Sequence, residues 1–294
     1  MSRVLLTGAS GFIGRHALTA LSDAGHEVHA VARHRGPHAP GVIWHEADLL
    51  AGCAVVSEVA PEVLVHLAWY AEHGKFWDAP ENVRWVQASL ELLQEFAAAG
   101  GRRVVMAGTC AEYEWSRELY PEDAPLRPST LYGAAKHGLH TVAAAYAQQL
   151  GLSLAWGRLF FLYGPHEAPG RFVSSLVRAL LAGERAPMTA GTQRRDFMHA
   201  ADAGAAFAAL ADDPLTGAVN IASGEGLQLR ELASLIAAHT GGQELLGIGE
   251  LPTRAGDPPS LLADATRLHH ELGFRSQISL DTGLQETISW WRAR

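Results

Sequence analysis

The sequence of 294 residues is poor in cysteine and has no strongly basic segment. Its two cysteines, Cys53 and Cys110, lie far apart and outside any C-x-x-C pattern, which excludes a disulfide framework and a zinc site of the usual spacing. The fifteen histidines are scattered, and none is assigned to a metal. This cysteine usage fits a reducing environment, and we expect a cytoplasmic protein.

The chain also lacks a long apolar run, and we expect no export signal. No stretch of about 18 uninterrupted apolar residues occurs, so no membrane span is expected. Residues 1–9 have the character of a strand and a turn, unlike a cleavable leader. The formal net charge of -8, from 23 basic and 31 acidic residues, argues against nucleic acid and anionic membranes as partners.

Short apolar runs alternate with stretches of helical spacing. The expected strands are 3–7, 27–32, 42–45, 63–67, 103–107 and 153–156. The expected helices between them include 12–24, 82–99 and 131–150. Alternation of this kind predicts an α/β fold with a doubly wound, parallel, Rossmann-type sheet that binds ligands at the carboxyl ends of its strands.

A glycine-rich loop follows the first expected strand. Its glycines Gly8, Gly11 and Gly14 have the spacing G-x-x-G-x-x-G, with Ser10, Phe12 and Ile13 between them. Small residues there let the backbone approach a pyrophosphate, whose charge the helix amides can hold. We therefore predict a dinucleotide-binding domain over residues 1–164, joined by about 198–222, and a smaller, mainly substrate-binding α/β domain over 165–294.

Two charged positions bear on the choice of dinucleotide. The second strand is followed by Arg33, where a site for NAD usually has a carboxylate. A guanidinium can form charge-assisted bonds to a 2'-phosphate, so NADP(H) is the favoured cofactor, with NAD(H) possible and a solvated basic loop as the alternative. Asp48, after the third strand, is a candidate acceptor from adenine or a turn former.

Tyr132 and Lys136 have the spacing Y-x-x-x-K within the expected helix 131–150. Residues four apart share one helix face, so the ammonium of Lys136 can lie beside the phenol of Tyr132 and lower its pKa from the usual value near 10. A surface pair is the plainer explanation, but the glycine-rich loop in the same chain favours hydride chemistry.

These motifs occur in the order seen in the extended short-chain dehydrogenase/reductases, and the chain resembles their NAD-dependent epimerase/dehydratase branch. The similarity includes Asp48-Leu49, His66-Leu67-Ala68 and Thr109, and it continues through Arg158–Pro165, Arg195-Asp-Phe197 and Arg254-Ala-Gly-Asp257. The resemblance implies that Leu49, Leu67 and Ala68 contact the cofactor. It also implies that Tyr132 is the acid/base, that Lys136 holds the nicotinamide ribose, and that Thr109 holds the reacting oxygen.

The same resemblance implies a nucleotide-diphosphate sugar as substrate, with Arg195 and Arg254 on its diphosphate. Departures from the family pattern narrow the reaction. Cys110 and Ala111 occupy the positions where related 4,6-dehydratases have Asp-Glu, and Ala111 also replaces the Glu of related decarboxylases. Phe161 stands where many relatives have a substrate-contacting Asn, so the sugar end of the pocket is expected to differ.

The leading hypothesis is therefore an NADPH-dependent reduction of a keto group, at carbon 4, of a nucleotide-linked deoxysugar, with Tyr132 as proton donor. A nucleotide-sugar 4-epimerase with tightly bound NAD is the main alternative. Another carbonyl reductase, with Trp69, Tyr70, Trp77 and Phe161 lining an apolar pocket, and a non-catalytic dinucleotide sensor are further alternatives. Apolar positions along 82–99 and 131–150 predict a homodimer or burial against the sheet.

Overall fold

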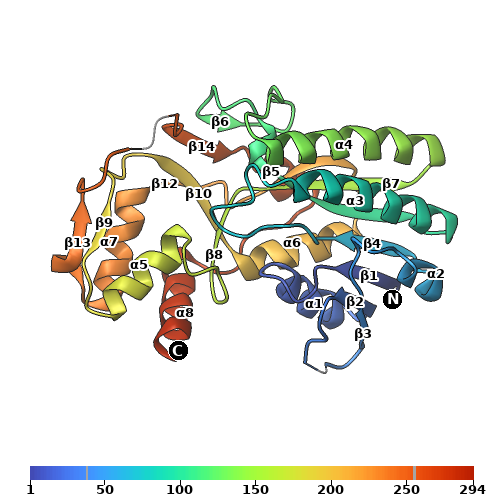
Figure 1. The fold of residues 1–294 in the computed structure, drawn as a ribbon, viewed down its shortest axis with the longest axis horizontal. Coiled ribbons are helices and arrows are strands. Elements are labelled where there is room, and N and C mark those ends of the chain that lie inside the picture. The colour runs from blue at the N-terminus through green and yellow to red at the C-terminus, as the bar shows by residue number, and fades with distance from the viewer. Residues whose placement is uncertain (38, 254–255) are drawn as a thin grey trace.

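The computed structural model describes residues 1–37, 39–253 and 256–294. Within these ranges the largest element is a parallel sheet of seven strands (Figure 1). From one edge to the other its strands are β11 (Gly217–Ile221), β7 (Ser153–Leu159), β5 (Arg103–Thr109), β4 (Val63–His66), β1 (Arg3–Thr7), β2 (Glu27–Ala32) and β3 (Val42–Glu46). The strand order reverses between β1 and β4, as in a doubly wound Rossmann-type fold.

Helices cover both faces of this sheet, because successive strand residues point to opposite sides. Val4 and Leu6 of β1 pack with α1 (Gly14–Asp23) and α6 (Ala200–Asp212), whereas Leu5 between them packs against the opposite layer. That layer consists of α2 (Val55–Val59), α3 (Glu81–Ala98) and α4 (Leu131–Leu150). Figure 1 shows α3 and α4 on one side of the sheet and α1 and α6 on the other. We call the sheet and these helices the parallel-sheet region.

The remaining strands form smaller sheets at the other end of the molecule (Figure 1). One joins β12 (Gly226–Gln228), β10 (Arg194–His199), β14 (Ser260–Ala263) and β6 (Leu119–Tyr120), with β8 (Phe161–Tyr163) also paired to β10. A second pairs β13 (Leu246–Ile248) with β9 (Ala186–Met188). Three helices pack around one apolar core there, namely α5 (Phe172–Leu181), α7 (Leu229–Thr240) and α8 (Leu280–Arg292). These elements are the small-sheet region, so the α/β fold class with a smaller second α/β part is confirmed.

The two regions exchange segments of chain. Strand β11 lies late in the sequence, yet it pairs with β7 and completes the parallel sheet. Conversely, β6 and β8 precede residue 165 and belong to the smaller sheet. The short remaining turns are η1 (Cys110–Glu112), η2 (Gln243–Leu245) and η3 (Arg267–Glu271). Within the described ranges, none of the helices has the length and apolar character that crossing a membrane requires.

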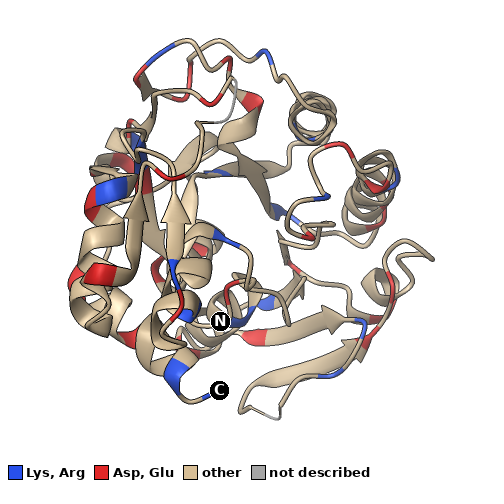
Figure 2. Ribbon diagram, turned by 60° about the vertical axis from the view of Figure 1, so that its left-hand side comes forward, with Lys and Arg blue, Asp and Glu red and all other residues tan. Residues whose placement is uncertain are grey.

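Charged residues are scattered over the ribbon of both regions, and Figure 2 shows acidic and basic positions interspersed on many elements. The net charge of -8 is therefore spread over the fold. An anionic ligand in this background needs local arginines for its binding.

Candidate functional site

Three neighbouring strands end at the same edge of the parallel sheet. Strands β1, β4 and β5 end at Thr7, His66 and Thr109, and each is followed by a segment that the sequence analysis singled out. The switch in strand order lies between β1 and β4, where such folds bind ligands. The Thr7 hydroxyl links these segments, because it lies 2.7 Å from His66 Nδ1 and accepts from the Ala68 amide at 3.3 Å.

The glycine-rich loop follows β1 in a backbone conformation that needs glycine. Gly8 has a φ of +70°, and a Cβ there would lie 2.7 Å from the amide nitrogen of Ala68. A Cβ on Gly14 would lie 2.0 Å from the Gly8 carbonyl oxygen, so α1 begins directly against the loop. Ser10 and Gly11 are exposed at its tip.

The loop offers unused amides to an anion. Among the described residues, none accepts a hydrogen bond from the backbone amide of Phe12 or Ile13, and Ile13 is the N-cap of α1. Free amides and the helix dipole favour negative charge at this end. The residues present therefore fit the pyrophosphate of a dinucleotide. Arg15 stiffens the loop through bonds to the carbonyl oxygens of Ser10 (2.9 Å) and Gly11 (3.2 Å), a contact that the sequence analysis missed.

The residues predicted to contact the adenosine of the dinucleotide follow β2 and β3, at the same edge of the sheet as the glycine-rich loop. Arg33 directly follows β2 and is exposed, so its guanidinium is accessible to a ligand. Asp48 uses Oδ1 to accept the amide of Leu50 at 3.0 Å, which is the bond of a turn former. The side chain of Leu49 is buried in the core between the sheet and the helices α2, α3 and α4.

Tyr132 lies in the first turn of α4, opposite Thr109. The Thr130 hydroxyl caps the helix by accepting from the Gly133 amide at 3.1 Å, and the Tyr132 amide donates to the Trp77 carbonyl at 2.9 Å. Burial raises the pKa of the Tyr132 phenol to about 12, and a hydrogen bond with the Thr109 side chain opposes this rise. The phenol is thus held in its protonated form at neutral pH.

Lys136 lies on the predicted helix but does not act on the phenol as expected. Its Nζ donates to the Ala107 carbonyl at 2.8 Å and lies 3.6 Å from the centre of the Trp69 ring. Burial lowers the pKa of Lys136 to about 7, and the charge of Glu112 partly offsets this. The expectation that Lys136 lowers the pKa of Tyr132 is wrong for this structure, because desolvation dominates both side chains.

Aromatic rings surround the phenol on several sides. Phe76 and Trp77 meet the Tyr132 ring edge-on, with centroids 4.9 and 5.9 Å away, and Trp69 lies at 6.5 Å. The guanidinium of Arg171 lies over the Phe76 ring at 5.8 Å, and its charge lowers the pKa of Tyr132 slightly. No sequence motif marks Arg171, which lies in a loop 39 residues beyond Tyr132.

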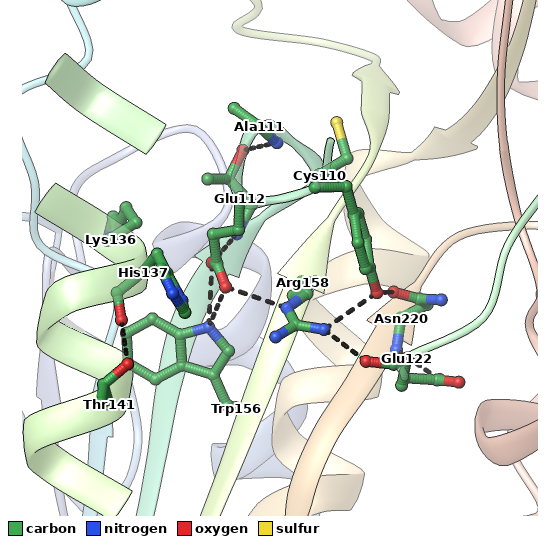
Figure 3. A network of polar contacts seen from close by, with 12 residues as sticks. Cys110, Ala111, Glu112, Glu122, Lys136, His137, Thr141, Trp156, Arg158 and Asn220 are labelled. Atoms are coloured by element: carbon green, nitrogen blue, oxygen red, sulfur yellow. Dashed lines mark hydrogen bonds and ion pairs between the residues drawn. The ribbon is translucent and has the colours of Figure 1, made fainter. Parts of the chain in front are cut away.

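A second missed residue lies behind Thr109. Glu112 ends the turn η1 and is completely buried, with its carboxylate paired to the Nε of Arg158 at 2.9 Å (Figure 3). Arg158 also donates to the Tyr113 hydroxyl at 3.0 Å, and that hydroxyl donates to Asn220 Oδ1 at 2.7 Å. This polar network ties η1 to β7 and β11 and underlies the active-site candidates.

Two of the predicted substrate residues, Phe161 and Arg195, lie in the small-sheet region. Arg195 is buried and donates to Asp257 Oδ1 at 2.6 Å, and its guanidinium lies 5.4 Å from the Phe161 ring. The structure thus brings Phe161 and Arg195 together. Arg195 can meet a diphosphate only with donors that Asp257 leaves unused. Arg254 lies outside the described residues.

Comparisons with known proteins agree with this fold. Residues 4–222 match the model of the NAD dependent epimerase/dehydratase family. The chain is 28% identical to UDP-glucuronic acid decarboxylase 1 of Xenopus tropicalis over 307 residues, covering 99% of this chain and 72% of that protein. It is 27% identical to the UDP-glucose 4-epimerase of Corynebacterium glutamicum over 301 residues, covering 92% and 90%.

A solved structure gives a closer match. MoeE5, determined in complex with UDP-glucuronic acid and NAD, superposes with a TM-score of 0.88 over 99% of each chain, at 33% identity. The family model covers most of this sequence, including the glycine-rich loop, Tyr132 and Lys136. The chain belongs to the NAD dependent epimerase/dehydratase family.

Proposed function

We propose that this protein reduces the 4-keto group of a nucleotide-linked deoxysugar with NADPH. The observation that carries the proposal is the convergence of Thr109, Tyr132 and Lys136 beside the glycine-rich loop at one sheet edge. A nucleotide sugar is the substrate class because MoeE5, 33% identical, holds UDP-glucuronic acid and NAD. Arg195 and Arg254 are the proposed diphosphate contacts.

The site's own residues handle the proton. A bound nicotinamide dinucleotide supplies the hydride to the carbonyl carbon. Tyr132, whose pKa is raised to about 12, is protonated at neutral pH and gives its proton to the carbonyl oxygen as that oxygen gains charge. Thr109 holds the same oxygen through its hydroxyl, and its hydrogen bond with Tyr132 stabilises the phenolate that remains, while Lys136 holds the nicotinamide ribose.

The two residues that follow Thr109, Cys110 and Ala111, offer no second base for proton removal from the sugar ring. Cys110 is buried, and burial raises the pKa of its thiol to about 12, so no thiolate forms at neutral pH. Ala111, also buried, has no titratable group. These two positions favour hydride transfer over dehydration or decarboxylation.

Arg33 supports NADPH over NADH. It is exposed just beyond β2, and the Ala9 amide of the glycine-rich loop donates to Val31 in that strand at 3.4 Å. A 2'-phosphate on the adenine ribose would reach this guanidinium, whereas a carboxylate there would repel it.

A 4-epimerase with tightly bound NAD is the second candidate, favoured by the similarity to the Corynebacterium glutamicum enzyme over nearly the whole chain. The same Tyr132 and Lys136 would serve it. The two candidates differ in cofactor balance, since an epimerase regenerates its nicotinamide in each cycle.

The deciding experiment mixes the protein with NADPH and a UDP-4-keto sugar and follows the absorbance of reduced nicotinamide. Stoichiometric loss of absorbance supports the reductase. Interconversion of UDP-glucose and its 4-epimer without added cofactor, and with NAD released on denaturation, would replace the reductase by the epimerase.

We also propose a homodimer formed by α3 and α4. Val83 on α3 and Val142 on α4 are each 51% exposed, and Leu150 is 46% exposed, so these helices present apolar side chains to solvent. Light scattering of the purified chain tests this, and a monomeric mass would contradict it.

A further inference from the structure

A surface loop of the small-sheet region contacts the glycine-rich loop of the parallel-sheet region. The contact joins Nη1 of Arg15, on α1, to Nδ1 of His166, and these two atoms lie 2.9 Å apart. His166 follows β8 and comes 151 residues after Arg15 in the sequence. The contact therefore connects the predicted cofactor loop to the region that holds the predicted substrate residues Phe161 and Arg195.

Arg15 fixes the tip of the glycine-rich loop. Its Nε and Nη2 atoms donate to the carbonyl oxygens of Gly11 and Ser10, so with His166 all three nitrogens of the guanidinium are engaged. A loop that contains three glycines loses much conformational freedom when it becomes ordered. A guanidinium that holds the loop beforehand lowers the cost of ordering that would otherwise oppose the binding of a dinucleotide.

His166 has a backbone conformation that suits glycine better than histidine. Its φ is +72°, and among the described residues Ala60, with a φ of +46°, is the other non-glycine residue with a positive value. A side chain with a Cβ is strained in this left-handed region, whereas glycine is not. Backbone strain of this kind is often found where a side chain has a function, so the imidazole itself is the group to explain.

Two helices of the small-sheet region hold the imidazole of His166 in place. Its ring packs against Trp290 of α8, with ring centroids 4.7 Å apart. The next residue, Glu167, accepts hydrogen bonds from the amide and the hydroxyl of Ser174 on α5, at 3.0 and 2.7 Å. His166 therefore meets Arg15 from a position that the small-sheet region determines.

The contact requires a neutral imidazole. A guanidinium only donates, so Nδ1 of His166 accepts from Arg15 and the imidazole proton lies on Nε2. A second proton would place an N–H on Nδ1 and turn the attraction into repulsion between two cations. Among the described residues, the titratable or charged groups that act on His166 are Arg15 and His16 on α1 and Arg294 after α8. Burial and the charges of the two arginines lower the pKa of His166 below its usual 6.5, so the contact is intact at neutral pH.

We propose that His166 is a positioning residue whose neutral imidazole holds Arg15 across the two regions and keeps the glycine-rich loop ready to receive a dinucleotide. Acid breaks the contact, and dinucleotide binding weakens as a result. The inference rests on the proposed function only in taking a dinucleotide as the ligand of the loop. It requires no particular sugar and no particular reaction.

The test is isothermal titration calorimetry of NAD+ and of NADP+ with the full chain, freed of bound nucleotide, at pH 8 and pH 5. His166→Asn is the informative variant, because its Oδ1 is bonded to Cγ as Nδ1 is in histidine and can accept from Arg15. Asparagine also tolerates a positive φ and does not titrate. Between pH 8 and pH 5 we expect the unaltered chain to lose roughly 3- to 10-fold more affinity than His166→Asn.

His166→Gly separates the side chain from the backbone. It relieves the strained φ and removes the acceptor, so we expect dinucleotide affinity at pH 8 to fall by roughly 3- to 10-fold without a lower midpoint of urea unfolding. Ala60→Gly is the matched control, because it relieves the same kind of strain at the end of α2, in the helix layer opposite α1. It should leave dinucleotide affinity unchanged.

Equal losses of affinity at pH 5 in the unaltered chain and in His166→Asn would overturn the proposal. Unaltered affinity of His166→Gly at pH 8 would overturn it as well. A failed reductase or epimerase assay would not, because no sugar and no hydride transfer enter the titration. The two proposals can therefore fail independently.

Discussion

Burial shifts the pKa values of three bases in the parallel-sheet region and of two carboxyls in the small-sheet region in opposite directions. In the parallel-sheet region, burial lowers the pKa of three bases, to about 7 for Lys136, about 3 for His66 and about 4 for His140. In the small-sheet region, burial raises the pKa of two carboxyls, to about 7 for Glu167 and about 6 for Asp196. In both sets burial favours the neutral form of the group. It does so by lowering the pKa of a base and by raising the pKa of a carboxyl.

The partners of these groups differ as well. Glu167 and Asp196 receive hydrogen bonds from backbone amides and serine hydroxyls, which fix segments of the small-sheet region. Lys136, in contrast, has a single carbonyl and an indole face. The two carboxyls therefore stabilise the structure of the small-sheet region. The lysine has a pKa close to neutral pH, so small electrostatic changes alter its protonation state.

The largest expected effect is the loss of turnover in Tyr132→Phe. This change removes an acidic group from the parallel-sheet region, where most other groups with shifted pKa values are bases. We expect turnover to fall by roughly 100- to 10,000-fold, because general acid catalysis is lost. Binding of NADPH should stay unchanged, as measured by fluorescence titration. Near-normal turnover in the variant would show that Tyr132 is not the proton donor.

The next effect concerns an exposed base of the same region. Arg33→Asp should weaken NADPH binding by about 10- to 100-fold and leave NADH binding unchanged or improved, because a charge-assisted bond becomes a repulsion. Arg35→Asp is the matched control, since Arg35 is also exposed two residues further on. Equal losses for NADPH in both variants would mean that the loop attracts anions without reading the 2'-phosphate.

The smallest effect is on stability and tests the contrast between the regions. A carboxyl whose folded pKa is raised, such as Glu167, contributes stability that is present below its unfolded pKa of 4.5 and lost as pH rises through about 7. Glu167→Gln should therefore be more favourable at pH 8 than at pH 4. The change that it makes in the free energy of unfolding should be on the order of 1 to 3 kcal/mol more positive at pH 8. Urea unfolding at the two pH values measures this.

Lys136→Met should change stability with the opposite pH dependence. The lowered pKa of Lys136 means that its burial costs stability below about 7, and that this cost disappears as pH rises toward the unfolded value of 10.5. The methionine variant should gain stability at pH 6 and lose that advantage at pH 10. Parallel pH trends for the Glu167 and Lys136 variants would contradict the contrast between the two regions.

Much of the parallel-sheet region could be predicted from sequence because its signals are local. Helix α4 has the predicted bounds, since Thr130 caps its start and Gly151, with a φ of +68°, ends it. The predicted start of α1 at residue 12 was early by two residues, because the glycine-rich loop continues to Gly14. The reversal of strand order followed from the βαβ pattern.

The rest required contacts between distant segments. Glu112 looks like an ordinary loop carboxylate until Arg158, 46 residues later, is placed beside it by β7. Strands β6 and β8 have two and three residues, too short for a periodic signal. The orientation of Lys136 depends on the Trp69 ring, which approaches from a different strand end.

The late return of β11 and α6 to the parallel sheet has a consequence for biosynthesis. These elements lie beyond residue 199, yet α6 supplies much of one core layer and β11 forms one edge of the sheet. A nascent chain that has left the ribosome only as far as α4 and β7 still exposes that apolar face of its strands. The parallel-sheet region therefore cannot complete its folding during translation until most of the protein has been made.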